Sequence, residues 1–173
     1  MRETMRCKIN PVSANDIPDL ETLYADKDVW AYLGGVRSTI QIKDGIEEII
    51  SFQGAPKYFV VRRKEDASYI GSIALDKHHN NEDTEISYMF LSSCRGKGYA
   101  FETVSVMIEY AFQTLPISRL VAETQTLNMP SCKMLKRLGF SEVDRLNRFD
   151  AEQTIFAINR TVFMADTRQY LGV

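Results

Sequence analysis

The sequence has few cysteines, and their placement excludes two kinds of site. Its three cysteines, Cys7, Cys94 and Cys132, are an odd number at wide spacing, and no Cys-x-x-Cys pair occurs. This pattern provides neither a disulfide framework nor a zinc site built from cysteines. The adjacent His78 and His79 lie in a polar stretch with no cysteine nearby. We therefore interpret the two histidines as part of a surface turn and expect no metal ion.

The chain also lacks long hydrophobic runs and any excess of positive charge. No apolar run approaches the ~18 residues that a membrane helix needs, and the N-terminal residues 1–6 contain no apolar segment of a signal peptide. Lysine and arginine total 21 against 23 aspartates and glutamates, a net charge of −2. This balance gives no sign of a broad basic face for nucleic acid. We expect a cytoplasmic protein that binds neither nucleic acid nor a membrane.

No linker or repeat divides the chain. Its five prolines and nine glycines are scattered, with no Pro/Gly/Ser-rich or low-complexity tract. A length of 173 residues is typical of one ordinary domain, and a hydrophobic content of 45% is enough to build a core. These values exclude disorder as the main state. One domain is expected to span nearly the whole chain.

Hydrophobic periodicity predicts an α/β fold. Strands are predicted at residues 5–12, 57–62, 69–75, 84–91, 119–125, 140–147 and 155–166. Helices are predicted at residues 14–24, at 27–33 before Gly34-Gly35, and at 39–53, 98–114 and 129–138. This order predicts a largely antiparallel sheet flanked by helices, and not a doubly wound nucleotide-binding fold.

The segment Cys94-Arg95-Gly96-Lys97-Gly98-Tyr99-Ala100 lies between a predicted strand and an amphipathic helix. Its glycines lack Cβ atoms where backbone N–H groups would approach a ligand, and a helix N-terminus favours an anion. Arg95 and Lys97 add positive charge, so the segment suits a pyrophosphate, although a Gly-x-Gly turn alone is more often only a turn. It is not a Walker A loop, since Gly98 follows Lys97. It is not a dinucleotide fingerprint either, since Phe101 stands where the third glycine belongs.

Three separated motifs resemble the GNAT-type N-acetyltransferase superfamily. Arg95–Ala100 resembles its Arg/Gln-x-x-Gly-x-Gly/Ala signature, and Asn128–Ser131 with Leu138–Phe140 resembles its Asn-x-x-Ser…Leu-Gly-Phe segment. Glu85-Ile86-Ser87-Tyr88 is similar to a strand of the ribosomal-protein alanine acetyltransferase-like (RimJ/RimL) branch. The resemblance covers residues 7–169 and implies one GNAT-like domain. Its mixed, mostly antiparallel sheet would have about six or seven strands, splayed in the middle to admit acetyl-CoA.

The resemblance implies that acetyl-CoA is the co-substrate and that no metal takes part. The pyrophosphate would be bound by the backbone amides of Arg95, Gly96, Lys97, Gly98, Tyr99 and Ala100. Pantetheine would pair with the backbone of Met89, Phe90 and Leu91. Phe90 or Leu91 would then offer an amide to the thioester oxygen. Asn128 and Ser131 would contact the cofactor, but both are equally explained as the start of a helix.

Acetyl transfer to nitrogen needs an uncharged amine, and a free α-amine has a pKa of about 8 and a lysine of about 10.4. Glu123, five residues before Asn128, stands where some family members have a general base. Glu85 is a second candidate, and water without a dedicated base is a third. Leu135 stands where many members have a tyrosine that acts as the general acid and protonates the departing thiolate. A hydrogen bond from Ser131 could help the thiolate to leave instead. We expect direct transfer rather than an acetyl-cysteine intermediate.

The acceptor remains open at this point. Trp30, Tyr32 and Leu33, together with the chain beyond Phe149, are candidates for an acceptor pocket, although aromatic residues equally often form the core. The expected function is acetyl-CoA-dependent N-acetyl transfer to a primary amine, either a protein N-terminal α-amine or a small amine. The alternative is a non-catalytic acyl-CoA-binding sensor or accessory domain of the same fold. A homodimer is compatible with the resemblance.

Overall fold

The structure is a computed structural model that describes residues 1–33, 38–52 and 57–164. The strands are β1 (Arg2–Glu3), β2 (Cys7–Pro11), β3 (Tyr58–Arg63), β4 (Tyr69–Lys77), β5 (Thr84–Phe90), β6 (Arg119–Gln125), β7 (Ser141–Arg148) and β8 (Ala151–Asn159). The helices are α1 (Ile17–Ala25), α2 (Thr39–Ser51), α3 (Tyr99–Thr114) and α4 (Met129–Arg137), with short 3-10 helices at Ala14–Asp16, Val29–Tyr32 and Ser92–Cys94. The predicted Gly34-Gly35 turn and the predicted domain end at residue 169 lie outside the described residues. Within them, no helix is long and apolar enough to cross a membrane.

The strands form one mixed sheet in the order β1-β2-β3-β4-β5-β6-β8-β7. The ladder between β5 and β6 is parallel, whereas those of β1–β2, β2–β3, β3–β4, β6–β8 and β7–β8 are antiparallel. The predicted α/β class with a mostly antiparallel sheet is therefore confirmed. Among the described residues the sheet has eight strands instead of the predicted six or seven, because a strand as short as β1 has no periodicity to detect.

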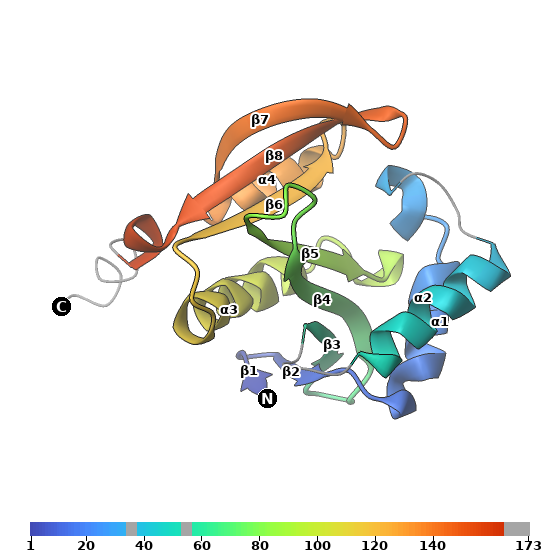
Figure 1. Ribbon diagram of the computed structural model, residues 1–173. Coiled ribbons are helices and arrows are strands. Elements are labelled where there is room, and N and C mark those ends of the chain that lie inside the picture. The colour runs from blue at the N-terminus through green and yellow to red at the C-terminus, as the bar shows by residue number, and fades with distance from the viewer. Residues whose placement is uncertain (34–37, 53–56, 165–173) are drawn as a thin grey trace. The chain divides into compact units, whose positions relative to one another are not determined.

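The chain divides into two compact units. The first combines Met1–Ala74 with Tyr88–Val106, and the second combines Leu75–Ser87 with the chain from Met107 onward. In the first unit α1 and α2 lie side by side (Figure 1). Between them the indole Nε1 of Trp30 donates to the Tyr24 carbonyl at 2.6 Å, and both side chains are buried. Trp30 is thus a core residue.

In the second unit, β6 pairs with β8 along its whole length, and β7 and β8 form a long hairpin beside it (Figure 1). Phe149 and Asp150 join β7 to β8 with φ of 54° and 56°. Positive φ at both central residues is the requirement of the tight turn whose twist matches a hairpin. The hairpin therefore places Arg148, the last residue of β7, next to the turn.

The ladder between β5 and β6 contains two residue pairs, Thr84–Leu120 and Glu85–Val121, and stops there although both strands continue. On the β4 side of β5, the Leu91 N–H donates to the Ile70 carbonyl at 3.0 Å. The end of β5 therefore remains paired with β4 after its pairing with β6 has stopped.

Candidate active site

The loop before α3 has the backbone geometry that anion binding requires. Gly96 and Gly98 have φ of 72° and 80°, a backbone conformation that residues other than glycine adopt only with strain. Such positive-φ residues turn successive N–H groups toward one side of the loop. A Cβ atom built at Gly96 would meet no atom within 4 Å. The loop thus presents open backbone at the N-terminus of a 16-residue helix, as the sequence predicted.

Arg6, which the sequence analysis missed, holds this loop against the first turn of α3. Its Nη1 donates to the Lys97 carbonyl at 2.9 Å, and its Nε donates to Glu102 Oε2 at 2.7 Å. The Arg6 backbone N–H donates to the other Glu102 oxygen at 2.8 Å, and the guanidinium carbon lies 4.6 Å from the centre of the Tyr99 ring. The carboxylate of Glu102, in the first turn of α3, is therefore paired with a cation.

The two predicted cations of the loop each donate to a backbone carbonyl. Arg95 Nη2 donates to the Asp28 carbonyl at 2.7 Å, and Lys97 Nζ donates to the Ser93 carbonyl at 3.0 Å. Both acceptors are neutral, and both cationic side chains are exposed. An anion that binds the loop amides would therefore meet two positive charges that these contacts do not neutralise.

The backbone amides of Phe90 and Leu91, at the end of β5, differ in their hydrogen bonding. The Leu91 N–H is already bound to the Ile70 carbonyl of β4. Because successive N–H groups of a strand point to opposite sides, the Phe90 N–H points away from β4. Of the two predicted amides, that of Leu91 is therefore already engaged with β4.

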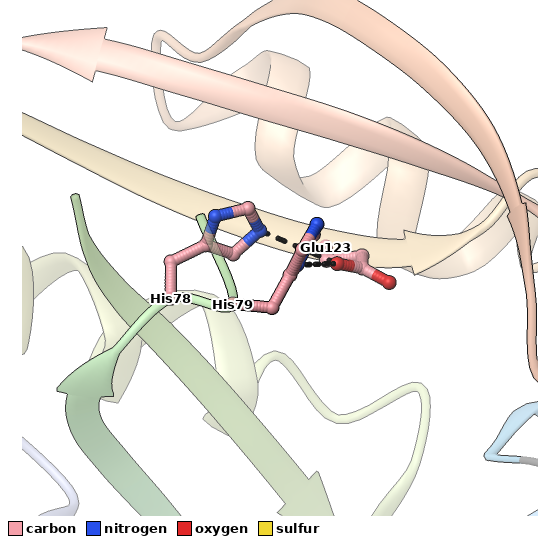
Figure 2. Close-up of side chains that lie close together, drawn as sticks. All are labelled: His78, His79 and Glu123. Atoms are coloured by element: carbon pink, nitrogen blue, oxygen red, sulfur yellow. Dashed lines mark hydrogen bonds and ion pairs between the residues drawn. The ribbon is translucent and has the colours of Figure 1, made fainter. Parts of the chain in front are cut away.

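A second cluster lies in the second unit, around the carboxylate of Glu123 on β6 (Figure 2). One of its oxygens, Oε2, lies 3.3 Å from His78 Nε2, 3.1 Å from His79 Nδ1 and 3.3 Å from Arg148 Nη1. The Glu123 side chain is 8% exposed and that of His78 only 2%. The prediction of a surface turn is therefore wrong for His78, since the structure turns this ring inward onto a residue that is distant in sequence.

The other predicted carboxylate, Glu85, belongs to the same cluster. Burial raises the pKa of Glu85 to about 7, and the nearby Glu123 adds to this rise, while His78 and Arg148 oppose it. Partial burial of the His79 ring lowers the pKa of this residue, and the adjacent His78 lowers it further. The two candidate bases were predicted to lie on neighbouring strands, and the structure places them in one cluster. The cluster also contains the side chains of His78, His79 and Arg148.

The motif residues at the start of α4 have local structural roles. Asn128 is the N-cap of α4, since its Oδ1 accepts the Ser131 N–H at 3.4 Å, and its Nδ2 donates to Thr124 at 3.2 Å. Leu135 is fully buried in the core, so this position provides no acid. Burial raises the pKa of the Cys132 thiol, which makes it a poor nucleophile. The cap interpretation of Asn128 is confirmed.

Comparison with known proteins identifies the family. The sequence model of the acetyltransferase (GNAT) domain matches residues 6–141. The chain belongs to the GNAT acetyltransferase family. It is therefore an enzyme of the N-acetyltransferase class, as the motifs predicted.

Two curated relatives of this GNAT chain carry names of the same class. Uncharacterized N-acetyltransferase YnaD of Bacillus subtilis is 34% identical over 85 residues, which span 49% of each chain. Uncharacterized N-acetyltransferase p20 of Bacillus licheniformis is 28% identical over 98% of this chain and 97% of its own. Among solved structures, spermidine N-acetyltransferase of Vibrio cholerae, in complex with CoA and spermine, superposes with a TM-score of 0.77. It is 15% identical over 91% of this chain and 98% of its own, so this likeness shows the fold.

Proposed function

We propose that this chain transfers the acetyl group of acetyl-CoA directly to a primary amine. The loop before α3 carries this proposal, because the glycines at 96 and 98 open its backbone and Arg95 and Lys97 supply free charge. These are the features that the diphosphate of CoA needs. Membership of the GNAT family supports the proposal, and so does the CoA complex of the Vibrio cholerae relative.

In this proposal the end of β5 binds pantetheine as an additional strand. Support comes from the two-residue ladder to β6, since the backbone of Met89 and Phe90 continues beyond its last pair at Glu85. The Phe90 amide would then donate to the thioester oxygen. As the tetrahedral intermediate forms, this oxygen becomes negative and the hydrogen bond strengthens, which lowers the barrier.

Glu123 is the proposed general base. The incoming ammonium first gives one proton to the Glu123 carboxylate, directly or through one water molecule. The neutral amine nitrogen then attacks the thioester carbon and the C–N bond forms. The nitrogen of the tetrahedral intermediate releases its second proton to solvent, and the C–S bond breaks as the CoA thiolate leaves. A thiol pKa of about 8.5 makes the thiolate a tolerable leaving group without a dedicated acid. Glu85 is the alternative base, and Ser131 the alternative aid to thiolate departure.

Two observations favour two different classes of acceptor. The segment from Glu85 to Tyr88 favours the RimJ/RimL-like branch and hence a protein N-terminal α-amine. The spermine bound to the Vibrio cholerae relative favours a small polyamine instead. The buried Leu135 in place of a tyrosine acid is an observation in favour of the alternative, a non-catalytic acyl-CoA-binding domain, but membership of the acetyltransferase family weighs against it.

Thermal unfolding with acetyl-CoA, CoA, ATP and NAD tests the cofactor. Gly96→Asp places a negative charge in the loop, and Gly96→Asn is its neutral control, since both side chains tolerate positive φ. A ligand at 100 times its Kd stabilises by about 2.7 kcal/mol, a shift of about 5–11 °C for this size. We expect this shift with acetyl-CoA and CoA alone, kept in the Asn variant and lost in the Asp variant. Equal shifts with ATP, or none with CoA, would refute the proposal.

Release of CoA thiol with a panel of amines tests the chemistry. The panel contains peptides with a free α-amine, their N-formylated controls, and polyamines. We expect Glu123→Gln to lower kcat about 10²–10⁴-fold without weakening CoA binding. If Glu85→Gln has this effect and Glu123→Gln does not, the base is Glu85. CoA binding without release from any amine would establish the non-catalytic alternative.

A further inference from the structure

Two imidazole nitrogens and one carboxylate oxygen converge in the cluster of the second unit. His78 Nε2, His79 Nδ1 and an oxygen of Glu123 all lie within 4.8 Å of one another. We propose that these three side chains bind Zn²⁺ and that the bound ion inhibits acetyl transfer. Sequence alone gives no such site, because Glu123 lies 45 residues after His78.

The distances between the donor atoms fit a tetrahedral zinc ion. Zinc lies about 2.0–2.2 Å from nitrogen and carboxylate ligands, so two ligands of one tetrahedron lie roughly 3.3–3.5 Å apart. In the cluster, Glu123 Oε2 lies 3.3 Å from His78 Nε2 and 3.1 Å from His79 Nδ1. Two histidines and one glutamate also form a known zinc ligand set, which leaves the fourth position to water. Two of the three edges therefore already match a zinc tetrahedron, and the third, between the two imidazole nitrogens, is at most 4.8 Å long.

Two features of the cluster limit the affinity. Arg148 Nη1 lies 3.3 Å from the same Glu123 oxygen, so the guanidinium must withdraw when a cation binds. Its side chain is 36% exposed and stacks on Phe149 at the hairpin turn, which leaves it room to do so. The buried Nδ1 of His78 has no hydrogen-bond partner among the described residues. A missing partner of this kind weakens metal binding by about 10–100-fold, so we expect a reversible site.

The inhibitory half of this inference rests on the proposed function, whereas the binding half does not. A carboxylate that ligates zinc cannot accept the proton of an incoming ammonium. The ion also repels the positively charged amine before it loses that proton. Occupation of the site should therefore lower kcat in proportion to the fraction of protein that holds zinc, while CoA binding at the loop before α3 persists.

Titration of chelator-treated protein with Co²⁺ measures binding directly. Tetrahedral Co²⁺ with nitrogen and oxygen ligands gives intense visible ligand-field bands, and Zn²⁺ should displace it. We expect the bands in the wild type and about a tenfold or greater loss of affinity in His79→Gln, whose side chain is partly exposed and replaceable. Glu47→Gln, which removes an exposed carboxylate on α2, is the control and should bind as the wild type does.

Arg148→Gln provides the opposite test, because it removes the competing cation. A double and a single positive charge about 5 Å apart repel even across water by an amount equal to about tenfold in affinity. This variant should therefore bind Co²⁺ and Zn²⁺ about ten times more tightly. Absence of the bands in the wild type, or equal affinity in His79→Gln, would overturn the site.

The activity measurement then separates the two proposals. If Zn²⁺ binds and amine-dependent thiol release continues at full rate, the inhibitory half is wrong. If no amine supports release, the inhibitory half fails together with the proposed function, and the Co²⁺ titration still determines the metal site. If zinc lowers kcat and His79→Gln needs about tenfold more zinc for the same loss, both halves are supported.

Discussion

Gly71 on β4 has no room for a side chain, and its replacement tests the geometry of the proposed pantetheine strand. A Cβ atom at this position would overlap the Met89 carbonyl oxygen and the nearest carbons of the Phe90 ring. The first of these neighbours is backbone, so it can move only if the end of β5 moves with it. Gly71→Ala should therefore displace the segment whose backbone we propose pairs with the cofactor.

The expected loss of stability can be worked out from these contacts. An additional methyl group in a well-packed region costs typically about 1–3 kcal/mol. Alanine also stiffens the unfolded chain, which returns about 0.4–1 kcal/mol. We therefore expect the free energy of unfolding of Gly71→Ala to fall by about 1–2 kcal/mol. For a chain of 173 residues, this loss lowers the Tm by about 2–8 °C.

Urea unfolding and calorimetric titration with CoA together check this reasoning. The affinity for CoA should fall more in Gly71→Ala than in Ser93→Ala, a control at an exposed residue whose hydroxyl contacts Cys94 Sγ. A Gly71→Ala protein with wild-type stability would show that β5 yields without cost. Reduced stability with unchanged CoA affinity would show that the end of β5 does not bind the cofactor.

Three further outcomes are expected. In Gly96→Ala the new Cβ meets no neighbouring atom, so the free energy of unfolding measured in urea should fall only by the cost of positive φ, about 1–2 kcal/mol. A larger fall would contradict the open space at this loop. Burial opposes ionisation of Asp16, but hydrogen bonds from Arg62 outweigh it and lower its pKa, so its contribution is present above about pH 4 and lost as the pH falls further. Asp16→Asn should therefore be less stable than the wild type at pH 7 by about 1.5–3 kcal/mol, with a gap that narrows in acid unfolding. The buried Cys132 should react with a thiol reagent more slowly than the half-buried Cys94, as peptide mapping would detect, and Cys132→Ala should retain acetyl transfer.

Most strands and helices could be predicted from the sequence because local periodicity determines them, and β6 occupies the predicted residues 119–125. The predicted strand over residues 155–166 is wrong at its end. β8 stops at Asn159, and residues 160–164 form a helical turn in which Phe163 packs on Phe112, with ring centres 5.6 Å apart. A short apolar run fits either conformation, and here a tertiary contact determines which one forms.

Some residues of the candidate site could likewise be predicted from local sequence, and others could not. Gly96 and Gly98 could be predicted, since a loop that needs positive φ selects glycine locally. Arg6 could not be predicted, because its contact with Glu102 spans 96 residues of sequence and leaves no periodic signal. The two histidines are adjacent in sequence, but their partner became known only when the fold brought Glu123 of β6 to the residues that follow β4 within the second unit. Long-range contacts of single polar side chains are therefore the part that pattern analysis misses.

The Glu123 carboxylate illustrates why distance alone does not assign a role to such a cluster. Separations of 3.1 and 3.3 Å between its Oε2 and the two imidazoles serve equally as hydrogen bonds and as edges of a zinc tetrahedron. Charge separates the two uses, because a guanidinium shares this oxygen with hydrogen-bonding imidazoles but not with a divalent cation. Arg148 at the exposed hairpin turn therefore determines whether the oxygen remains free of metal. Acceptance of an ammonium proton and ligation of zinc are then mutually exclusive uses of one buried carboxylate.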